Sequence, residues 1–493
     1  MWLKNSGESH IINEWKLFDG DNSRMRKDNL KYWYRGFSNA AIVLLLTWIY
    51  KYVWSTQLNI LLLRPFENKG NILLYVVYLL LSIFVIYTFD GFKIGVNRIS
   101  HIIISQWVSM AIVNAIEAIQ SVLMIGFVLH FGRIFRAYVE IMLIDAACIF
   151  VVTYVLTKLY RTIFPPLRML MVYSDYANNL AKKMNSRRDK YIIADRVHEN
   201  TPVNEIAEMM QEYDAVLLND VSTDIKSDVL KACYEQGKRV YFTPKISDIL
   251  VKNAEELHLF DTPIYLCRNL GMSMTQLAIK RAADIVISLL GIIITSPIML
   301  VAGIAIRCYD GGPAFYRQVR CTKDKREFEI IKFRSMVVDS EKDGKARLAA
   351  ENDDRITPIG KFIRATRIDE LPQFFNILKG DMSFVGPRPE RPEIIAEYEQ
   401  EIPEFAYRTR VKAGLTGYAQ VYGKYNTTNL DKLKLDLIYV ERGSILLDLK
   451  LILLTIKVVF IKDSTEGLEE GETTAGTMSG KEISEEKRVT KNK

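Results

Sequence analysis

Long apolar runs are the feature of this 493-residue sequence that most restricts its fold. Four of them occupy about residues 37–54, 72–89, 102–129 and 137–157, and each is close to the roughly 20 residues that cross a bilayer as a helix. The second, ILLYVVYLLLSIFVIYTF, contains no charged residue. The pattern predicts a bundle of four transmembrane helices over residues 37–160, preceded by a polar cytoplasmic segment at 1–36.

Charge predicts how this bundle is oriented. Basic residues flank its start, its second loop and its exit (Arg24, Arg26, Lys27, Lys31, Arg35, Lys93, Arg98, Lys158 and Arg161), so both ends of the bundle should lie in the cytoplasm. Arg133 and Arg136, in the expected third loop, oppose this orientation. The net charge of +7 suits contact with an anionic membrane face and does not indicate nucleic-acid binding.

Three carboxylates interrupt the third and fourth apolar stretches: Glu117, Glu140 and Asp145. They are expected to face the bundle interior or to lie near an interface, because an ionised group in contact with lipid is costly. A transport pathway is the alternative interpretation.

An α/β domain is predicted over residues 161–270. RMLMVYS (168–174), KYIIADR (190–196), DAVLLND (214–220) and KRVYFTP (238–244) are typical of buried strands, with helical stretches at 202–212 and 223–236 between them. This alternation indicates a parallel, Rossmann-like sheet. Dinucleotide binding needs glycines at the first strand–helix turn, and no glycine occurs between Arg133 and Gln236. We therefore expect a domain that does not bind nucleotide and that contacts other protomers or partner proteins.

Residues 281–307 form a fifth apolar segment with basic residues on both sides. Lys280 and Arg281 stand at its start, where they are expected to meet lipid headgroups, and Arg307 and Arg317 stand at and after its end. Ser296 and Pro297 stand at its middle, and proline removes a helix hydrogen bond and bends the chain. The segment is predicted to enter one leaflet and return, as a re-entrant helix. A proline-kinked spanning helix is the alternative.

The stretch TRIDELPQFF (366–375) places Asp369 and Glu370 side by side before an apolar run. One interpretation is the polar start of an ordinary helix, with Asp as the N-cap and Gly380 at the end. The other is a catalytic pair. Further along, the apolar stretch 444–460 is expected to be an interfacial or a core helix, and the polar tail 463–493 is expected to be disordered.

The motifs around this pair are dense and rich in arginine. GGPAFYRQVR (311–320), KFRSM (332–336), DDRITPIGKFIRATRIDELPQ (353–373), GDMSFVGPRPE (380–390) and GLTGYAQVYG (414–423) follow one another. Guanidinium groups match phosphate oxygens, although a single arginine is more often part of a solvated salt bridge. Seven of them near one carboxylate pair favour a diphosphate substrate (Arg317, Arg320, Arg334, Arg355, Arg364, Arg367 and Arg388).

These segments, in this order, closely resemble the bacterial sugar transferase family of monotopic phosphoglycosyl transferases. The resemblance covers about residues 276–462. With the four helices and the α/β domain it resembles the large form of the family, which initiates exopolysaccharide, capsule or O-antigen assembly. It implies a mainly α catalytic domain on the cytoplasmic face of the bacterial inner membrane, with a re-entrant helix broken at Ser296-Pro297.

The resemblance also implies chemistry for individual residues. Asp369 would attack the sugar-proximal phosphate of a UDP-sugar and expel UMP, and polyprenyl (undecaprenyl) phosphate would then take the phospho-sugar. Glu370 would assist, as a neighbour of Mg²⁺ or as a general base, and both carboxylates would hold the Mg²⁺ cofactor. The side chains expected to bind substrate phosphate are Arg364, Arg388, Arg334, Lys332 and Arg320.

Several features stay open at this point. Cys321-Thr322, Tyr418 and Tyr422 depart from the residues usual in the family motifs. A homo-oligomer and contacts with polysaccharide-assembly proteins are expected of the α/β domain. Two rival functions are a catalytically silent scaffold of polysaccharide assembly and a glycosyltransferase with a metal site at Asp19-Gly20-Asp21, a triplet expected to form a polar turn.

Overall fold

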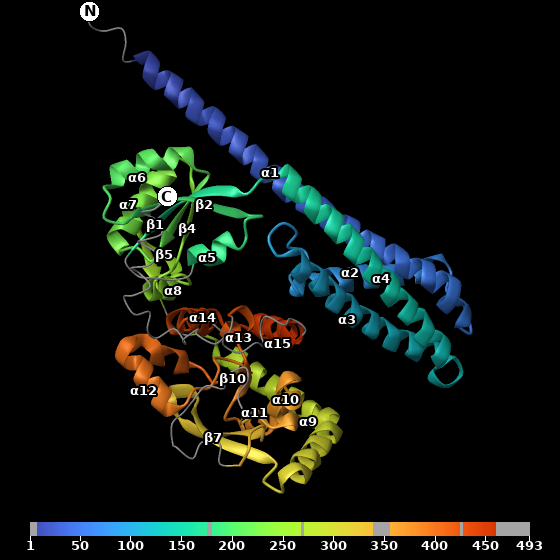
Figure 1. Cartoon of the computed structure of the whole chain (residues 1–493). Coiled ribbons are helices and arrows are strands. Elements are labelled where there is room, and N and C mark those ends of the chain that lie inside the picture. Colours follow the sequence, from blue (N-terminus) through green and yellow to red (C-terminus); the bar gives the residue numbers. More distant parts are fainter. Residues whose placement is uncertain (1–6, 175–179, 268–270, 339–354, 424–426, 460–493) are drawn as a thin grey trace, which may run out of the picture. The chain divides into compact units, whose positions relative to one another are not determined.

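The computed structural model describes residues 7–174, 180–267, 271–338, 355–423 and 427–459. The chain divides into two compact units, Met1–Thr243 and Pro244–Lys493, which are described separately below (Figure 1). The predicted disordered tail at 463–493 and most of the first strand–helix turn of the α/β domain, at 175–179, lie outside the described residues.

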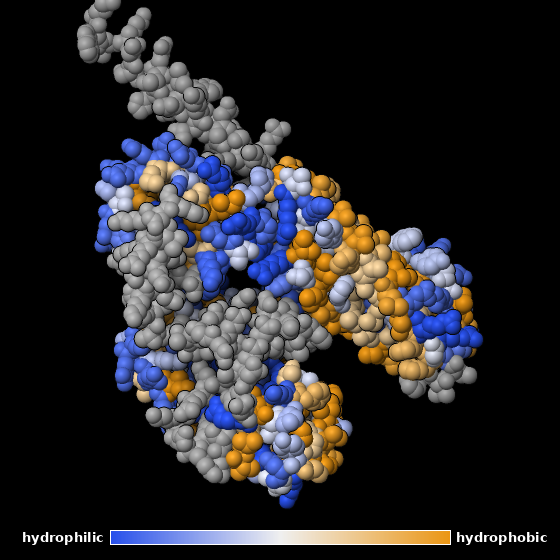
Figure 2. All heavy atoms as spheres, in the orientation of Figure 1, coloured by the Kyte–Doolittle hydropathy of each residue, from blue (hydrophilic) through white to orange (hydrophobic). Residues whose placement is uncertain are grey.

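Four long helices pack together in the first unit: α1 (Gly7–Val53), α2 (Asn68–Thr88), α3 (Ile99–Ile125) and α4 (Phe127–Ile163). Each is long and apolar enough to cross a membrane, and the sides of this bundle are largely hydrophobic in Figure 2. Helix α1 begins far upstream of residue 37, so the polar segment is largely helical and Asp19-Gly20-Asp21 is not a turn. Arg133 and Arg136 lie within α4 and not in a loop.

The interior of the bundle is polar and aromatic at one level. The rings of Tyr50 and Tyr78 stack with centroids 4.0 Å apart. The hydroxyl of Tyr50 donates to Glu117 at 3.1 Å, and the amide of Asn114 donates to Asp145 at 3.0 Å. Glu117 and Asp145 are each 1% exposed, so the prediction that they face the interior is confirmed.

The rest of the first unit is a parallel α/β domain. Its four strands, β1 (Leu167–Tyr173), β2 (Tyr191–His198), β3 (Ala215–Asn219) and β4 (Arg239–Phe242), are ordered β2-β1-β3-β4. Helices α5 (Leu180–Asn185), α6 (Val203–Met209) and α7 (Thr223–Glu235) connect them. Leu170 and Val216 pack under Ile206 and Val229, whereas Met169 and Leu217 form a second core with α5 on the other face. Strand β3 is buried throughout because a parallel sheet is covered on both faces. The four predicted strands are confirmed.

The boundary between the units lies earlier than the expected residue 270. Helix α8 (Ile246–Val251) and the hairpin of β5 (Glu255–Leu259) and β6 (Thr262–Leu266) belong to the second unit. Ile249 is 3% exposed and packs with Leu433 and Leu437, and the amide of Asn253 donates to the Glu441 carbonyl at 2.9 Å. The parallel strand pattern ends at β4, and Ile246 and Ile249 of α8 pack with the apolar core of the second unit.

The next element of the second unit is α9 (Met274–Asp310), one continuous helix of 37 residues with Pro297 inside it. The expected interruption at Ser296-Pro297 therefore does not appear as a break in secondary structure. The hydroxyl of Ser296 donates to the Ile293 carbonyl at 2.8 Å, within the helix. Proline removes only one backbone donor, so the turns on either side can stay helical.

Both halves of α9 pack on the same domain. Near its start, Asp284 is 5% exposed and accepts hydrogen bonds from the Ser383 hydroxyl at 3.1 Å and the Phe384 N–H at 3.0 Å. Near its end, Ala302 and Ile306 form a core with Phe333 and Ile363. The helix is thus joined to the domain on either side of Pro297.

Lys280 and Arg281 point into the domain and not towards lipid headgroups, contrary to expectation. The ammonium of Lys280 donates to Asp448 at 2.5 Å and to the Val385 carbonyl at 3.0 Å. The guanidinium of Arg281 donates to the carbonyls of Ile377 and Leu378 at 2.7 and 2.8 Å, in the last turn of a helix. Both side chains thereby join the start of α9 to the rest of the domain.

The remaining elements of the second unit are short and mainly helical. The strands are the antiparallel hairpin β7 (Phe315–Cys321) with β8 (Glu327–Phe333) and the parallel pair β9 (Ser383–Val385) with β10 (Gly414–Thr416). The helices are α10 (Pro358–Ala365), α11 (Gln373–Lys379), α12 (Pro392–Glu401), α13 (Tyr418–Tyr422), α14 (Asn429–Arg442) and α15 (Ile445–Val459). Helix α15 buries Leu451 and Leu454 and exposes Leu446, so one face of it belongs to the core.

The packing of α8 predicts where a stable fragment of the second unit begins. A fragment 244–493 should unfold at a higher temperature than a fragment 272–493, because burying Ile249 contributes about 1.5–3 kcal/mol and the shorter fragment loses it. Calorimetry in detergent measures both midpoints. Ile249→Ala in the longer fragment should lower its midpoint towards that of the shorter one. Equal midpoints for the two fragments would show that α8 contributes nothing to this core.

Candidate active site

Asp369 and Glu370 lie in a single turn of 3₁₀-helix, Ile368–Glu370, and not at a helix N-cap. Arg367 precedes the turn in the left-handed conformation, with φ 55°, and no side chain caps it. Helix α11 starts only after Pro372. Proline is favourable at a helix start because it has no backbone N–H that would be left without a partner there. The capping interpretation is therefore wrong, whereas Gly380 does end α11 with φ 97°.

A buried asparagine holds this segment against the hairpin. Asn376 of α11 is 2% exposed, accepts from the Ile331 N–H at 2.9 Å and donates to the Glu329 carbonyl at 2.7 Å. Both partners lie on β8, the strand that carries Lys332. The asparagine thereby fixes the position of the acidic pair relative to Lys332.

Glu370 is surrounded by three cations from three segments. Its carboxylate lies 3.1 Å from Arg388, 3.5 Å from Lys332 and 3.6 Å from Arg367, and its side chain is 13% exposed. Burial alone would raise the pKa of Glu370, but Arg388, Lys332 and Arg367 outweigh it and lower the pKa to about 2. Glu370 is therefore ionised throughout the physiological range.

Asp369 has the opposite electrostatic environment. Burial, and then the adjacent charge of Glu370, raise the pKa of Asp369 to about 6, although Lys332, Arg364 and Arg388 oppose this shift. None of the described residues donates a hydrogen bond to its carboxylate. Two neighbouring carboxylates with pKa values this far apart indicate two different chemical roles.

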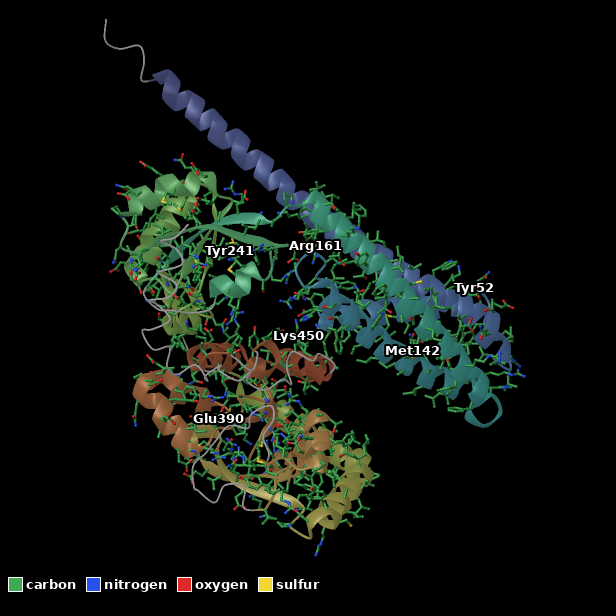
Figure 3. The ribbon with its side chains drawn as sticks, viewed as in Figure 1. Tyr52, Met142, Arg161, Tyr241, Glu390 and Lys450 are labelled. Carbon is green, nitrogen blue, oxygen red and sulfur yellow. The ribbon has the colours of Figure 1, made fainter. Side chains whose placement is uncertain are left out.

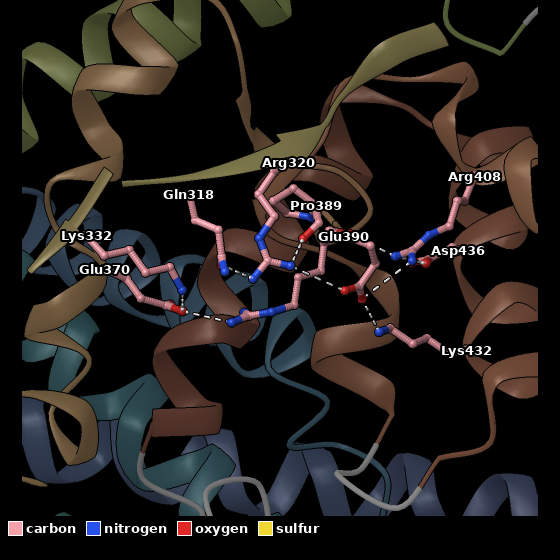
Figure 4. A network of polar contacts seen from close by, with 10 residues as sticks. Gln318, Arg320, Lys332, Glu370, Pro389, Glu390, Arg408, Lys432 and Asp436 are labelled. Atoms are coloured by element: carbon pink, nitrogen blue, oxygen red, sulfur yellow. Dashed lines mark hydrogen bonds and ion pairs between the residues drawn. The ribbon is translucent and has the colours of Figure 1, made fainter. Parts of the chain in front are cut away.

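A second layer of charges, drawn in Figure 4, supports Arg388. Glu390 lies 2.5 Å from Lys432, 3.6 Å from Arg408 and 3.7 Å from Arg320. Burial would raise the pKa of Glu390, but Lys432 and Arg408 outweigh it and lower the pKa to about 2. The guanidinium of Arg408 also donates to the Arg388 carbonyl at 3.0 Å.

Sequence reasoning missed part of this layer. Arg408 and Asp436 are 2% and 1% exposed and form an ion pair at 2.7 Å, and Lys432 pairs with Glu390. One signal was available: Asp436 occupies a position of helical apolar spacing between Leu433 and Leu437, both of which are buried. A carboxylate on such a face needs a buried partner.

Two of the five expected phosphate-binding side chains, Arg388 and Lys332, contact Glu370 of the acidic pair. Arg364 acts there through its charge, as one of the groups that oppose the raised pKa of Asp369. Arg320 lies one layer out, where it pairs with Glu390 and donates to Gln318 at 2.7 Å. Arg334 pairs with Asp310 at the end of α9, and no contact with the acidic pair is seen among the described residues.

The loop that carries Arg388 is fixed by close backbone contacts. The Gly386 N–H donates to the Thr416 carbonyl at 2.9 Å, and the Gly414 N–H donates to the Pro387 carbonyl at 2.9 Å. A Cβ at Gly386 would lie 2.2 Å from the Lys412 carbonyl oxygen, so a side chain there would collide with backbone. The glycines of the GPRPE and GLTG motifs therefore allow β9 and β10 to approach each other.

Comparison with known proteins identifies this domain. Residues 275–462 match the family model described as Bacterial sugar transferase. A Bacillus subtilis protein, provisionally named an undecaprenyl-phosphate N-acetylgalactosaminyl 1-phosphate transferase, is 52% identical over 132 residues, which are 27% of this chain and 73% of that protein. The chain belongs to the bacterial sugar transferase family.

Two further relatives each match about half of this chain. The UDP-glucose:undecaprenyl-phosphate glucose-1-phosphate transferase of Klebsiella pneumoniae is 42% identical over 228 residues, 44% of this chain and 47% of the relative. The UDP-N-acetylgalactosamine-undecaprenyl-phosphate N-acetylgalactosaminephosphotransferase of Aeromonas hydrophila is 37% identical over 253 residues, 50% and 59% of the two chains. The chain thus spans about half the length of these relatives.

Thr322, Tyr418 and Tyr422, which depart from the usual sugar transferase motifs, each make defined contacts in the structure. Thr322 is 2% exposed, its hydroxyl donates to the Asp381 carbonyl at 2.8 Å, and it accepts from the Ala413 N–H at 3.2 Å. Tyr418 and Tyr422 lie on α13 with ring centroids 4.6 Å apart. The side chain of Thr322 thus joins two backbone segments.

The pH dependence of stability should reveal the environment of Glu370. Because its pKa is lowered from 4.5 to about 2, it stabilises the fold above pH 4.5, and this contribution is lost as the pH falls towards 2. Glu370→Gln should cost about 1–3 kcal/mol at pH 7, partly offset by relief of Asp369. The difference from wild type in thermal unfolding should shrink as the pH falls from about 4.5 towards 2.

Glu329→Gln is the matched control for this prediction. Glu329 is an exposed partner of Arg317 on the same hairpin, so its loss should change stability by less than about 0.5 kcal/mol at any pH. A Glu370→Gln protein as stable as wild type at pH 7 would contradict the account of the site.

Proposed function

We propose that this protein transfers a sugar-1-phosphate from a UDP-sugar to undecaprenyl phosphate, as the names of its relatives describe for them. The observation that carries this proposal is the acidic pair, in which the pKa of Asp369 is raised and the pKa of Glu370 is lowered. Four cations, Lys332, Arg364, Arg367 and Arg388, act on two carboxylates, which leaves positive charge for a diphosphate.

Asp369 is the nucleophile in this proposal. Its carboxylate oxygen attacks the sugar-proximal phosphorus, the bond from that phosphorus to the bridging oxygen breaks, and UMP leaves with that oxygen. An oxygen of undecaprenyl phosphate then attacks the same phosphorus and breaks its bond to Asp369. The products are the lipid diphosphate sugar and a regenerated carboxylate. A pKa of about 6 leaves Asp369 mostly ionised at neutral pH while it stays more basic than an ordinary aspartate.

Glu370 is a positioning residue and not a general base. A carboxylate with a pKa of about 2 accepts a proton poorly, whereas its charge holds Arg388 and Lys332 beside Asp369. Arg388, Lys332 and Arg364 bind the phosphates and stabilise charge that moves from phosphorus to the leaving oxygen.

The donor set also fits Mg²⁺. That ion is commonly held by one or two carboxylates together with substrate phosphates, and Asp369 offers oxygens that accept no hydrogen bond from the described residues. Asp369 and Glu370 would hold it. The ion would offset the charge of the diphosphate.

Substitution of the nucleophile tests the reaction. Asp369→Asn should reduce UMP release by at least about a thousandfold while the protein stays folded, because an amide is a far poorer nucleophile. The assay supplies Mg²⁺, undecaprenyl phosphate and a panel of UDP-sugars to membranes. Asp324→Asn is the matched control, since that exposed residue has φ 55°, which asparagine tolerates. Release of UDP would favour a glycosyltransferase, and no release from wild type would favour a scaffold.

The placement of this domain on the cytoplasmic side of a bacterial inner membrane is part of the same proposal. It is supported by the contacts of both halves of α9 with one domain and by the basic residues on both sides of α9. A helix that enters one leaflet and returns, bent near Pro297, satisfies both observations.

Two native cysteines on either side of the apolar part of α9 test this placement. Cys267 precedes α9 and Cys308 lies near its end, and both are exposed. In intact cells carrying either cysteine alone, an impermeant maleimide added outside should label neither, and both should react after the membrane is opened. Labelling of Cys308 alone from outside would establish a spanning helix. Pro297→Leu should favour that outcome and abolish activity.

A further inference from the structure

Basic side chains gather at one end of the membrane bundle, in the first unit and far along the chain from the acidic pair. The membrane part of α1 starts here, α2 and α3 are joined by residues 89–98, and α4 runs on into the α/β domain. Tyr34 donates to the Leu156 carbonyl at 2.7 Å, and Asn39 donates to the Phe92 carbonyl at 3.2 Å, so these segments touch. Figure 3 labels Arg161 at this end of α4.

A turn of the α/β domain joins the same cluster. The guanidinium of Arg187 donates to the Val96 carbonyl at 3.0 Å and to Asp189 at 2.9 Å. Arg161 pairs with Asp189 at 2.7 Å. The next residue, Lys190, lies over the Tyr191 ring at 4.7 Å. We call the set Arg35, Lys93, Arg161, Arg187 and Lys190 the junction cluster.

The junction cluster is short of negative charge. Asp189 is already shared by Arg161 and Arg187, and Lys93 pairs with Asp90 at 3.2 Å. No carboxylate among the described side chains lies within ion-pair distance of Lys190 or Arg35; Arg35 instead donates to the Tyr160 hydroxyl at 2.9 Å. The Nε atoms of Arg35 and Arg161 are buried and make no hydrogen bond with the described residues.

The excess of positive charge in the junction cluster acts most strongly on Lys190. Burial, and then the charges of Arg187 and Arg35, lower the pKa of Lys190 to about 8, and Asp189 offsets only part of this. Like charges held together in a half-buried place destabilise one another, and an anion among them removes that cost. On an ordinary solvent-exposed surface, long basic side chains extend into water and move apart. Here they are held close together.

We propose that the junction cluster binds the phosphate group of an anionic lipid in the leaflet at this end of the bundle. Guanidinium and ammonium groups are the donors that phosphate oxygens select, and basic pockets between membrane helices on the cytoplasmic side bind lipid headgroups. The apolar flanks of α1 and α4 continue from the cluster along the bundle, where the acyl chains of such a lipid would lie.

Lipid titration of the full-length protein in neutral detergent tests this inference. Phosphatidylglycerol should raise the unfolding midpoint, whereas phosphatidylcholine should not. Lys190→Gln should weaken phosphatidylglycerol binding at least tenfold, and Lys190→Glu should weaken it further. Lys183→Gln and Lys183→Glu are matched controls on an exposed lysine of α5 and should bind as wild type does. If either Lys190 variant unfolds without lipid, the other carries the comparison.

Two further probes distinguish the source of the phosphate. Stronger binding of undecaprenyl phosphate, lost in the Lys190 variants, would make the ligand the polyprenyl lipid itself. Inorganic phosphate with the same affinity would reduce the site to one for free phosphate. Equal effects of phosphatidylglycerol and phosphatidylcholine, or equal binding by wild type and both Lys190 variants, would overturn the proposal. None of these outcomes depends on transferase activity, so they are independent of the proposed function.

Discussion

The burial of one ionised carboxylate, Glu370, organises the catalytic domain. Its three cations come from β8, from the residue before the 3₁₀ turn and from the loop after β9. An unpaired charge at this depth would cost several kcal/mol, so these segments are stable only when they meet. The same constraint extends outward, because Arg388 is supported through its carbonyl by Arg408, which is itself paired with Asp436. The contacts that form the site are therefore also contacts that hold these segments of the fold together.

The two adjacent carboxylates illustrate how environment separates chemically similar groups. Glu370 receives the direct ion pairs, and its pKa falls; Asp369 receives burial and the repulsion of Glu370, and its pKa rises. In the proposed reaction one group is fixed as an anion that positions cations, and the other keeps enough basicity to attack phosphorus. Asn376 holds the acidic pair against β8, and the backbone contacts of Gly386 and Gly414 fix the loop that carries Arg388.

Patterns with a strong physical period were predictable from the sequence. The long apolar helices and the four parallel strands follow from apolar runs, and the acidic pair was found through its family motif. The expectations that were wrong concern residues whose positions depend on tertiary contacts. Nothing local reveals that Lys280 and Arg281 bond the domain and not lipid headgroups, or that α8 packs on Leu433. The expectation that Asp369 is an N-cap was wrong because Arg367 adopts the left-handed conformation, which an arginine in the sequence does not predict.

The central claim is that the Asp369 carboxylate becomes covalently bonded to phosphorus. The direct measurement is intact-mass and peptide mass spectrometry of the wild-type protein after incubation with Mg²⁺ and the accepted UDP-sugar, in the absence of undecaprenyl phosphate. We expect an added mass equal to one phospho-sugar, confined to the peptide that contains Asp369 and removed when undecaprenyl phosphate is supplied. Turnover with release of UMP but no such adduct under rapid acid quench, or an adduct on another residue, would contradict it.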